Sequence, residues 1–442
     1  MFLGFATVAT DASCNGSFSL MVPNASITGS VVTATATDPN GNTSEFSSCV
    51  PLGVPATNLV QFSAPTFNVT EACTSVALTV NRSGDTTGAA TVKYTSADGT
   101  ATERRDYITA IGTISFAPGE SSKNIAVLIN DDSYVEGPET FTVTLSNPTS
   151  VNLGATTVAT VQIADNATEP ATNVNDDPQT FVCQHYHDFL NREPDPSGLN
   201  FWKNEITSCG ADAACIEVKR NNVSAAFYVS IEFQQTGYLV ERLYKAAYGD
   251  LIAPSTLGGG HFLPVPIIRY SEFLPDTQQI GNGVIVNQGN WQQQLEDNKN
   301  AFAAAFAQRE QFTTAFPSSL TPAQFVDQLF LNTRVSPTTA DRNAAINEFG
   351  GAPDTSNVAA RGRSLRDVAE NVTFNQQEFN RAFVLMQYFG YLRRNANDAP
   401  DTDFTGYDFW LTKLQQFNGD YINAEMVKAF ITSIEYRNRF GP

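Results

Sequence analysis

The chain has 442 residues, which is enough for about two to four domains. Only 16% of the residues are charged, yet the formal net charge is −19 because lysine and arginine are scarce. Nucleic acids and anionic membrane surfaces attract basic patches, so we expect neither as a partner. No run of 18 apolar residues occurs, and we expect no transmembrane segment.

Residues 1–52 have the pattern of β-strands. The stretch SVVTATATDPNGNTSEFS alternates apolar and polar residues and breaks at DPNGN, a hairpin turn signal. It resembles the end of a bacterial Ig-like domain, and we therefore expect a truncated β domain here. The first residues carry no Lys or Arg before their apolar part, unlike a signal peptide. We expect the export signal to lie upstream or to be missing.

Residues 58–166 predict an antiparallel β-sandwich. Short alternating runs such as SVALTV, ATVKYTS, KNIAVLI and TFTVTLS follow one another, separated by the turns SGDTTG, ADGT and APGE. Because side chains alternate across a strand, one face of each run should form the core. The expected core positions are Ile125, Val127, Ile129, Phe141, Val143 and Leu145.

Acidic residues crowd the connections of this predicted sandwich. Asp131, Asp132, Glu136 and Glu139 share one connection, and Glu71, Asp106 and Asp165 stand at other strand ends. If the strands bring them to one tip, their repulsion raises their pKa values unless a cation is present. Ca²⁺ takes 6–8 oxygen ligands in irregular geometry, whereas Mg²⁺ and Zn²⁺ suit such a cluster less well. The alternative is a set of solvated acidic loops without an ion.

Residues 58–166 also resemble a Calx-beta domain. The resemblance rests on FNVTE, VKYTSADGTATERRDY, GTISFAPGESSKNIAVLINDD and EGPETFTVTLSNP. It implies calcium ligands at the acid that closes the first strand, at the Asp of the DY pair, at the double Asp and the two acids after it, and after the last strand. These positions are Glu71, Asp106, Asp131, Asp132, Glu136, Glu139 and Asp165.

The chain departs from the pattern of the family at two of these places. Asp165 is followed by Asn166 and Ala167 instead of further Asp residues, and Ser133 stands where a third Asp can occur. We therefore expect fewer or weaker calcium sites than in the best family members. Seven carboxylates still exceed the four positive charges of two Ca²⁺ ions, so charge does not forbid two ions.

The polar segment 167–179 predicts a linker, and residues 180–442 predict a helical half, because apolar residues recur there at spacings of three and four. FVCQHYHDFLNREPDPSGLNFW, from residue 181, is echoed from residue 383, and a further, degraded copy starts between them at residue 325, so that in chain order the copy at 383 is the third. Repeats of this kind indicate stacked helical pairs. From about residue 179 to 442 the chain resembles the domain of unknown function DUF4214, which implies no particular chemistry.

Two interpretations of the repeated motif stay open. In the first, Asp195 caps a helix, Gly198 takes a backbone angle that other residues avoid, and Trp202 and Trp410 pack one helix on the other. In the second, exposed Trp or Tyr side chains stack on sugar rings in a glycan-binding cleft, which Trp291 could join.

The six cysteines predict disulfides and an oxidising compartment. Cys209 and Cys215 enclose a short polar loop and form the expected first pair, and Cys14–Cys49 is the guess for a second. Cys183 and His187 lie four residues apart on one helix face and could bind Zn²⁺, but no third ligand is evident in the sequence. We therefore expect no zinc site.

The motifs searched for do not indicate an enzyme. The chain has no GxSxG, HExxH, P-loop or dinucleotide-binding motif, and it has only three histidines. We expect an exported, multidomain bacterial protein at the cell surface, with an all-β N-terminal half acting as a calcium-stiffened spacer or adhesion module and a helical half acting as an interaction module. The alternative is a glycan-binding or glycan-processing extracellular protein with its site in the helical half. Calcium ions are the expected partners, with cell-surface proteins or glycans as further candidates.

Overall fold

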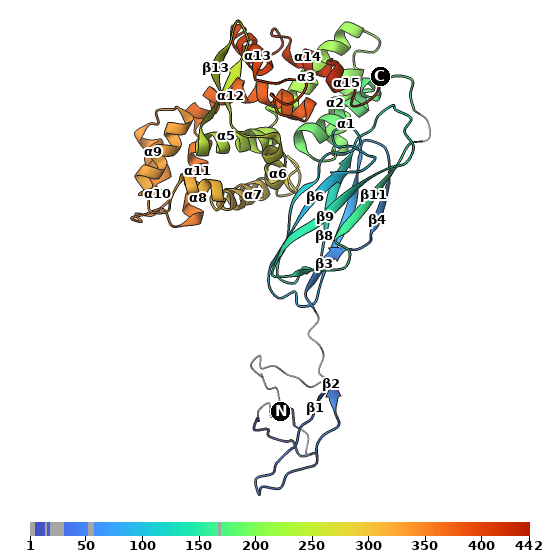
Figure 1. Cartoon of the computed structure of the whole chain (residues 1–442), viewed down its shortest axis with the longest axis vertical. Coiled ribbons are helices and arrows are strands. Elements are labelled where there is room, and N and C mark those ends of the chain that lie inside the picture. The colour runs from blue at the N-terminus through green and yellow to red at the C-terminus, as the bar shows by residue number, and fades with distance from the viewer. Residues whose placement is uncertain (1–4, 14–15, 18–30, 52–56, 167–168) are drawn as a thin grey trace. The chain divides into compact units, whose positions relative to one another are not determined.

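The structure is a computed structural model that describes residues 5–13, 16–17, 31–51, 57–166 and 169–442 (Figure 1). The chain divides into two compact units, residues 1–58 with 83–85 and residues 59–82 with 86–442. In the first unit, β1 (Val31–Val32) pairs antiparallel with β2 (Val50–Pro51). The predicted DPNGN turn is present, because the backbone N–H of Gly41 donates to the carbonyl of Asp38.

The second unit begins with a β-sandwich. One sheet has the strand order β10-β3-β5-β8 and the other the order β4-β11-β9-β6-β7. The pairs β10–β3 and β11–β4 are parallel, and the pairs β5–β8, β11–β9, β6–β9 and β6–β7 are antiparallel. The strands are β3 (Leu59–Phe62), β4 (Thr66–Thr70), β5 (Thr74–Ser83), β6 (Ala90–Asp98), β7 (Ile111–Phe116), β8 (Ser122–Ile129), β9 (Glu139–Thr149), β10 (Asn152–Leu153) and β11 (Val158–Ala164).

The core of the sandwich lies between the two sheets. The alternation expected from the sequence is present in β8 and β9, where Ile125, Val127, Ile129, Phe141, Val143 and Leu145 are all at most 3% exposed. Of the intervening residues, Ala126 is exposed and Thr142 and Thr144 are half-buried, as alternation in a strand requires, whereas Leu128 is also buried. The expected all-β first half is confirmed.

The remaining chain is mainly helical, which confirms the expected second half of the fold class. One β-hairpin, β12 (Asp250–Ser255) with β13 (His261–Pro266), interrupts the helices. The helices are η1 (Val174–Asp176), α1 (Pro178–His185), η2 (Tyr186–Leu190), α2 (Pro196–Thr207), α3 (Ala213–Val229), α4 (Ile231–Gln235), α5 (Gly237–Tyr248), α6 (Tyr270–Gly281), α7 (Trp291–Phe306), α8 (Glu310–Ala315), α9 (Pro322–Thr333), α10 (Thr339–Asn347), α11 (Val358–Ala369), α12 (Val372–Met386), η3 (Gln387–Leu392), α13 (Thr405–Gln416), α14 (Met426–Ile431) and α15 (Ile434–Arg437).

The three related sequence copies end their first helix in the same way. Asn191, Arg334 and Arg393 all have a positive φ, between 52° and 61°, at the end of that helix. Asn191 and Arg393 come ten residues after the first Phe of their copies, whereas Arg334 comes nine residues after Phe325. The extra residue of the first and third copies is absorbed by the π-helices η2 and η3.

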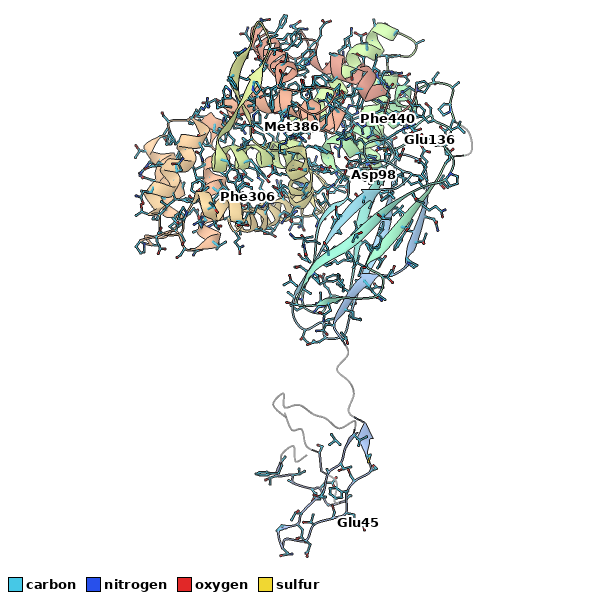
Figure 2. The ribbon with its side chains drawn as sticks, in the orientation of Figure 1. Glu45, Asp98, Glu136, Phe306, Met386 and Phe440 are labelled. Carbon is cyan, nitrogen blue, oxygen red and sulfur yellow. A yellow bond between two sulfur atoms is a disulfide. The ribbon has the colours of Figure 1, made fainter. Side chains whose placement is uncertain are left out.

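The sandwich and the helical half meet at one tip of the sandwich. Cys73, which precedes β5, is disulfide-bonded to Cys183 of α1. The backbone N–H of Ser133 donates to the carbonyl of Phe440 at 3.1 Å, next to Glu136 and Phe440 as labelled in Figure 2. The side-chain amide of Asn173 donates to the carbonyl of Gly441 at 2.8 Å. The segment that was expected to be a linker therefore holds buried residues within the compact unit.

Candidate functional site

The strand topology gathers acidic residues at the tip that faces the helical half. Because β4 and β11 run parallel, with Thr70 opposite Ala164, the residues that follow them, Glu71 and Asp165, are neighbours. The other acids lie in the β6–β7 connection, in the β8–β9 connection, at the start of β9 and in the segment after β11. We call the following set the acidic tip: Glu71, Asp106, Asp131, Asp132, Glu136, Glu139, Asp165 and Glu169.

One group of the acidic tip surrounds Asp106. Carboxylate oxygens of Asp106, Asp132 and Glu136 all lie within 4.8 Å of one another. Glu139 lies beside Asp106, whose carboxylate contributes to the raised pKa of Glu139. Arg105 lies beside this group, with its Nη2 2.5 Å from Glu136 Oε1 and its Nε 3.6 Å from Asp132 Oδ2. This arginine compensates part of the negative charge.

A second group of the acidic tip contains Glu71, Asp165 and Glu169, whose carboxylate oxygens also lie within 4.8 Å of one another. The backbone N–H of Asp132 donates to Glu71 Oε1 at 2.9 Å and joins the two groups. Asp131 lies beside them and accepts a hydrogen bond from Asn166 Nδ2 at 3.3 Å. The structure thus brings all seven predicted residues to one tip, although their role as ligands stays a prediction.

The raised pKa values show that burial, and then the neighbouring carboxylates, disfavour the charged forms of these groups. Burial and then the Asp132 carboxylate raise the pKa of Glu71 to about 9. Burial raises the pKa of Asp132 to about 7, and burial and then Asp106 raise the pKa of Glu139 to about 7. Asp165 is the exception, because the backbone N–H of Gly137 holds its pKa below the usual value.

Several carboxylate oxygens of the acidic tip are buried without a hydrogen-bond partner among the described residues. They are Asp165 Oδ1 and both Oε atoms of Glu169. Buried polar atoms are normally satisfied, and buried carboxylates are paired or bind a metal. Oxygen donors alone, several of them charged, are the set that a hard cation such as Ca²⁺ prefers. These residues therefore fit a calcium ion.

Sequence reasoning missed Glu169. It lies five residues before η1, within the segment predicted as a linker, and the resemblance assigned no ligand beyond Asp165. The pKa of Glu169 is raised to about 7 by burial and then by Asp165. The acidic run ADNATEP could have pointed to it, but only the folded chain returns this glutamate to the tip.

The repeated motif forms a similar arrangement in the first and third copies. The side chain of Asp195 caps α2 by accepting from the N–H of Gly198 at 2.9 Å, as predicted. Arg192 lies over the ring of Tyr186 and binds Glu232 through two hydrogen bonds of 2.7 and 2.8 Å. In the third copy, Arg394 lies over the ring of Tyr388 and binds Glu435 in the same way, at 2.5 and 2.9 Å.

A cavity of about 260 Å³ opens beside this arrangement in the third copy. Apolar and polar groups share its wall, which is the usual character of a small-molecule site. Its lining consists of Tyr388, Leu392, Arg394, Asp401, Gly406, Trp410, Ala429, Phe430, Ser433 and Glu435.

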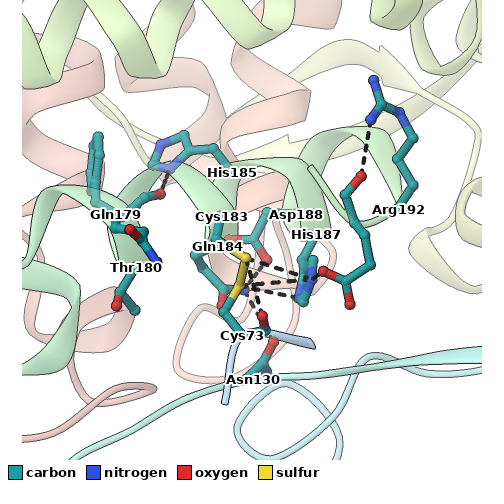
Figure 3. Close-up of a disulfide and its surroundings, with 12 residues drawn as sticks. Cys73, Asn130, Gln179, Thr180, Cys183, Gln184, His185, His187, Asp188 and Arg192 are labelled. Atoms are coloured by element: carbon teal, nitrogen blue, oxygen red, sulfur yellow. Dashed lines mark hydrogen bonds and ion pairs between the residues drawn. A yellow bond between two sulfur atoms is a disulfide. The ribbon is translucent and has the colours of Figure 1, made fainter. Parts of the chain in front are cut away.

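Two disulfides are present among the described residues. The predicted pair Cys209–Cys215 is formed. Cys14 lies outside the described residues, so the guessed pair Cys14–Cys49 is not described; Cys49 is exposed and has no disulfide partner in the part of the chain that the structure describes. The other disulfide, Cys73–Cys183, was not anticipated. It occupies the cysteine that had been weighed as a zinc ligand together with His187 (Figure 3).

Within the described residues, the structure contains no helix that is long and apolar enough to span a membrane.

Two family models match the chain. Residues 56–167 match the Calx-beta domain, and residues 164–236 match the domain of unknown function DUF4214. Both expected resemblances are thereby confirmed, and the chain contains a Calx-beta domain followed by a DUF4214 domain. The second match ends at residue 236, so it covers the first of the three helical copies and not the whole helical half.

Curated relatives match the chain over part of its length. Extracellular matrix organizing protein FRAS1 of Mus musculus is 31% identical over 211 residues, which are 45% of this chain and 5% of that protein. Sodium/calcium exchanger 1 of Rattus norvegicus is 44% identical over 89 residues, which are 20% of this chain and 9% of that protein. The chain thus spans only a small part of these relatives.

Solved structures of Calx domains are also similar. The apo-form Calx CBD1 domain is 32% identical and covers 25% of this chain and 98% of its own, with a TM-score of 0.24. The calcium binding domain CBD12 of CALX1.1 is 34% identical and covers 24% of this chain and 45% of its own, also with a TM-score of 0.24.

Proposed function

We propose that the chain is an exported, non-catalytic protein of several modules in which Ca²⁺ binds the acidic tip. The observation that supports this most is the set of buried carboxylate oxygens of Asp165 and Glu169 that have no hydrogen-bond donor among the described residues. The match of residues 56–167 to the Calx-beta domain and the similarity of the chain to sodium/calcium exchanger 1 support the same ion.

The chemistry of the ion in this proposal is charge neutralisation. Asp106, Asp132, Glu136 and Glu139 would hold one ion, and Glu71, Asp165 and Glu169 would hold another, with Asp131 beside them. An ion that binds only the folded tip stabilises it by mass action. The tip lies at the contact with the helical half, so the ion would make the module a rigid spacer or adhesion element.

The proposed location is extracellular or at the surface of a bacterial cell. Two disulfides among the described residues favour an oxidising compartment. The similarity to an extracellular matrix organizing protein agrees with this location. The helical half would then present an interaction surface to cell-surface proteins or glycans.

The test is calorimetric titration of the full chain with CaCl₂, together with thermal melts in calcium and in chelator. At a calcium concentration about 100 times Kd, the expected gain in the free energy of unfolding is about 2.7 kcal/mol. The variant Asp131→Asn/Asp132→Asn should lose most of this gain.

The matched control is Asp420→Asn/Asp354→Asn, which changes two exposed acids of the helical half that are held by local hydrogen bonds. This control should keep the calcium response of the unsubstituted chain. No heat of binding and an unchanged melt in the unsubstituted chain would refute the proposal.

A second candidate function is glycan binding at the cavity of the third helical copy. Trp410 and Phe430 supply apolar surface there, and Asp401, Glu435 and Ser433 supply groups that hydrogen-bond hydroxyls. The combination matches a sugar ring, which has an apolar face and a polar edge.

Screening of the chain on a glycan array, with calcium and with chelator, tests this second candidate. Binding that survives chelator and is lost in Trp410→Ala would support it. Trp291→Ala is the control, since Trp291 does not line the cavity. Absence of binding to all glycans, or equal loss in both variants, would argue against it.

A further inference from the structure

The junction disulfide lies against a buried histidine. His187 has an exposed fraction of 0%, and its Nε2 lies 3.8 Å from Cys73 Sγ and 4.0 Å from Cys183 Sγ. Glu193 Oε2 lies 3.7 Å from the same nitrogen. Figure 3 shows the imidazole directed at the sulfur atoms, with Cys183 and His187 on one helical segment and Cys73 on the sandwich.

The surroundings leave His187 without an ordinary partner. Neither ring nitrogen forms a hydrogen bond to an oxygen atom of the described residues; their close neighbours are the two sulfurs and the more distant Glu193 carboxylate. Glu193 Oε1 is itself buried without a hydrogen-bond partner in that part of the chain. Buried imidazoles and carboxylates usually have such partners. A ligand at this point would satisfy both groups.

We propose that the reduced chain binds Zn²⁺ at Cys73, Cys183 and His187, with Glu193 as the fourth ligand. Two thiolates, an imidazole and a carboxylate are a zinc ligand set. Tetrahedral zinc with Zn–S of about 2.3 Å and Zn–N of about 2.0 Å places S and N about 3.6 Å apart. The present S···N distances of 3.8 and 4.0 Å are close to this value.

Formation of the site follows a balanced sequence of steps. A dithiol reductant passes two electrons and two protons to the Cys73–Cys183 disulfide, and the reductant becomes a cyclic disulfide. The S–S bond breaks, and the two sulfurs separate to about 3.8 Å in a tetrahedral site. Zn²⁺ then binds both sulfurs as thiolates and releases the two thiol protons to solvent.

The charge of this site suits its burial. Two thiolates cancel the charge of Zn²⁺ and the imidazole is neutral, so the metal and these three ligands carry no net charge. The carboxylate adds one negative charge at a partly exposed position, since the Glu193 side chain is 38% exposed. A buried charge without a partner would be costly, and this arrangement avoids it.

The proposed site gives the junction two interchangeable links. In an oxidising compartment the sandwich is joined to α1 by the disulfide, and in a reducing compartment it would be joined by zinc through the same two sulfurs. Zinc could therefore join the sandwich to α1 before the chain reaches an oxidising compartment. This inference does not depend on calcium at the acidic tip, because the zinc ligands are separate residues.

The experiment uses the full chain, reduced with a phosphine and kept in excess CaCl₂ so that the carboxylates of the acidic tip are occupied. Zn²⁺ affinity is measured by competition with a chromophoric chelator, and Co²⁺ is added separately to detect thiolate-to-metal absorption. The cysteines 209 and 215 are replaced by Ser throughout, because they could bind metal once reduced. We expect each reduced chain to bind one Zn²⁺ tightly at this site, and the oxidised chain to bind none there.

Substitutions of the histidines identify the site. His187→Ala should lower the zinc affinity more than about 100-fold, since loss of a metal ligand exceeds the effect of losing its hydrogen-bonded support. His261→Ala, which changes an exposed hairpin residue, should not alter it. The oxidised His187→Ala chain retains its disulfide, and its melting curve shows whether it folds.

Two outcomes would overturn the proposal. One is that the reduced chain binds no more zinc than the oxidised chain. The other is that zinc binds with equal affinity in His187→Ala or in Cys73→Ser/Cys183→Ser, which would place the metal elsewhere.

Discussion

Arg439 and Asp188 form a buried, bidentate ion pair, with arginine Nη1 and Nη2 3.0 and 2.9 Å from the two carboxylate oxygens. The same guanidinium donates to the carbonyl of Tyr391 at 2.7 Å and to the carbonyl of Arg104 at 2.8 Å. Arg104 lies in the sandwich connection that carries Asp106. One side chain therefore joins the first helical copy, the third copy and the sandwich.

Replacement of Arg439 by Met should destabilise the second unit strongly. The change leaves Asp188 buried without its charge partner, and such a loss costs about 3–5 kcal/mol. The control is Arg342→Met, which breaks the exposed pair with Asp327 and should cost less than about 1 kcal/mol. Urea unfolding of both variants measures the difference. An equal loss of unfolding free energy in the two variants would show that the buried pair contributes no more to stability than the exposed pair.

The two disulfides should contribute unequally to stability. Cys73–Cys183 closes a loop with a sequence separation of 110, whereas Cys209–Cys215 closes one with a separation of 6. Loop-closure entropy predicts a contribution of about 5 kcal/mol from the first and about 2 kcal/mol from the second. Thermal melts of Cys73→Ser/Cys183→Ser and of Cys209→Ser/Cys215→Ser, without added metal, show which disulfide contributes more to stability. A larger loss from the short loop would contradict the entropic argument.

Calcium affinity should rise with pH between about 5 and 8. Glu71, with its pKa raised to about 9, and Asp132, Glu139 and Glu169, each near 7, hold protons that the ion must displace. In calcium-free protein these carboxyls bind protons more tightly in the folded state than in the unfolded state. Their stabilisation is therefore present at low pH and is lost as the pH rises through these values.

Titration calorimetry at pH 5.5 and 7.5 measures the change in calcium affinity. Thermal melts of the calcium-free protein at the same two pH values measure the change in stability. The affinity should be higher at pH 7.5, and the calcium-free melting temperature should be lower there. Glu71→Gln should weaken the pH dependence of the calcium-free melt. A calcium affinity that does not change with pH would contradict the raised pKa values.

Close packing of α11 on α7 depends on Gly362. A Cβ at this position would lie 2.8 Å from the backbone C of Ala303 and the backbone N of Ala304, so the helices would have to separate. Gly362→Ala should therefore cost about 1–3 kcal/mol, as overpacking does. Gly281→Ala is the matched control in α6, because its nearest neighbour would be 3.8 Å away. Chemical denaturation of both variants gives the comparison, and a neutral Gly362→Ala would refute the packing argument.

The sandwich could be predicted because the alternation of apolar and polar residues is visible within each single strand. Alternation in β8 and β9 identified core positions such as Ile125 and Phe141 without knowledge of any partner strand. The carboxylates were found for a related reason, since acids that follow strands can meet at one tip. Glu169 was missed because its return to the tip depends on the path of the chain after Asp165.

The junction could not be predicted from local patterns. Cys73 and Cys183 are far apart in the sequence, and nothing between them indicates that α1 lies against the sandwich. The sequence shows no third ligand near Cys183 and His187, because Cys73 of the sandwich approaches them only in the folded chain. The predicted boundaries between modules stay predictions, because the sandwich and the helical half form one compact unit.

The contacts of residues 438–441 with the sandwich have a consequence for biosynthesis. The sandwich can fold as soon as it leaves the ribosome, because all its strands precede residue 165. The loop that carries Ser133 acquires its bond to Phe440 only after translation has reached that residue. The disulfide partner Cys183 is available much earlier, so the bond between Ser133 and Phe440 completes a junction that α1 can begin.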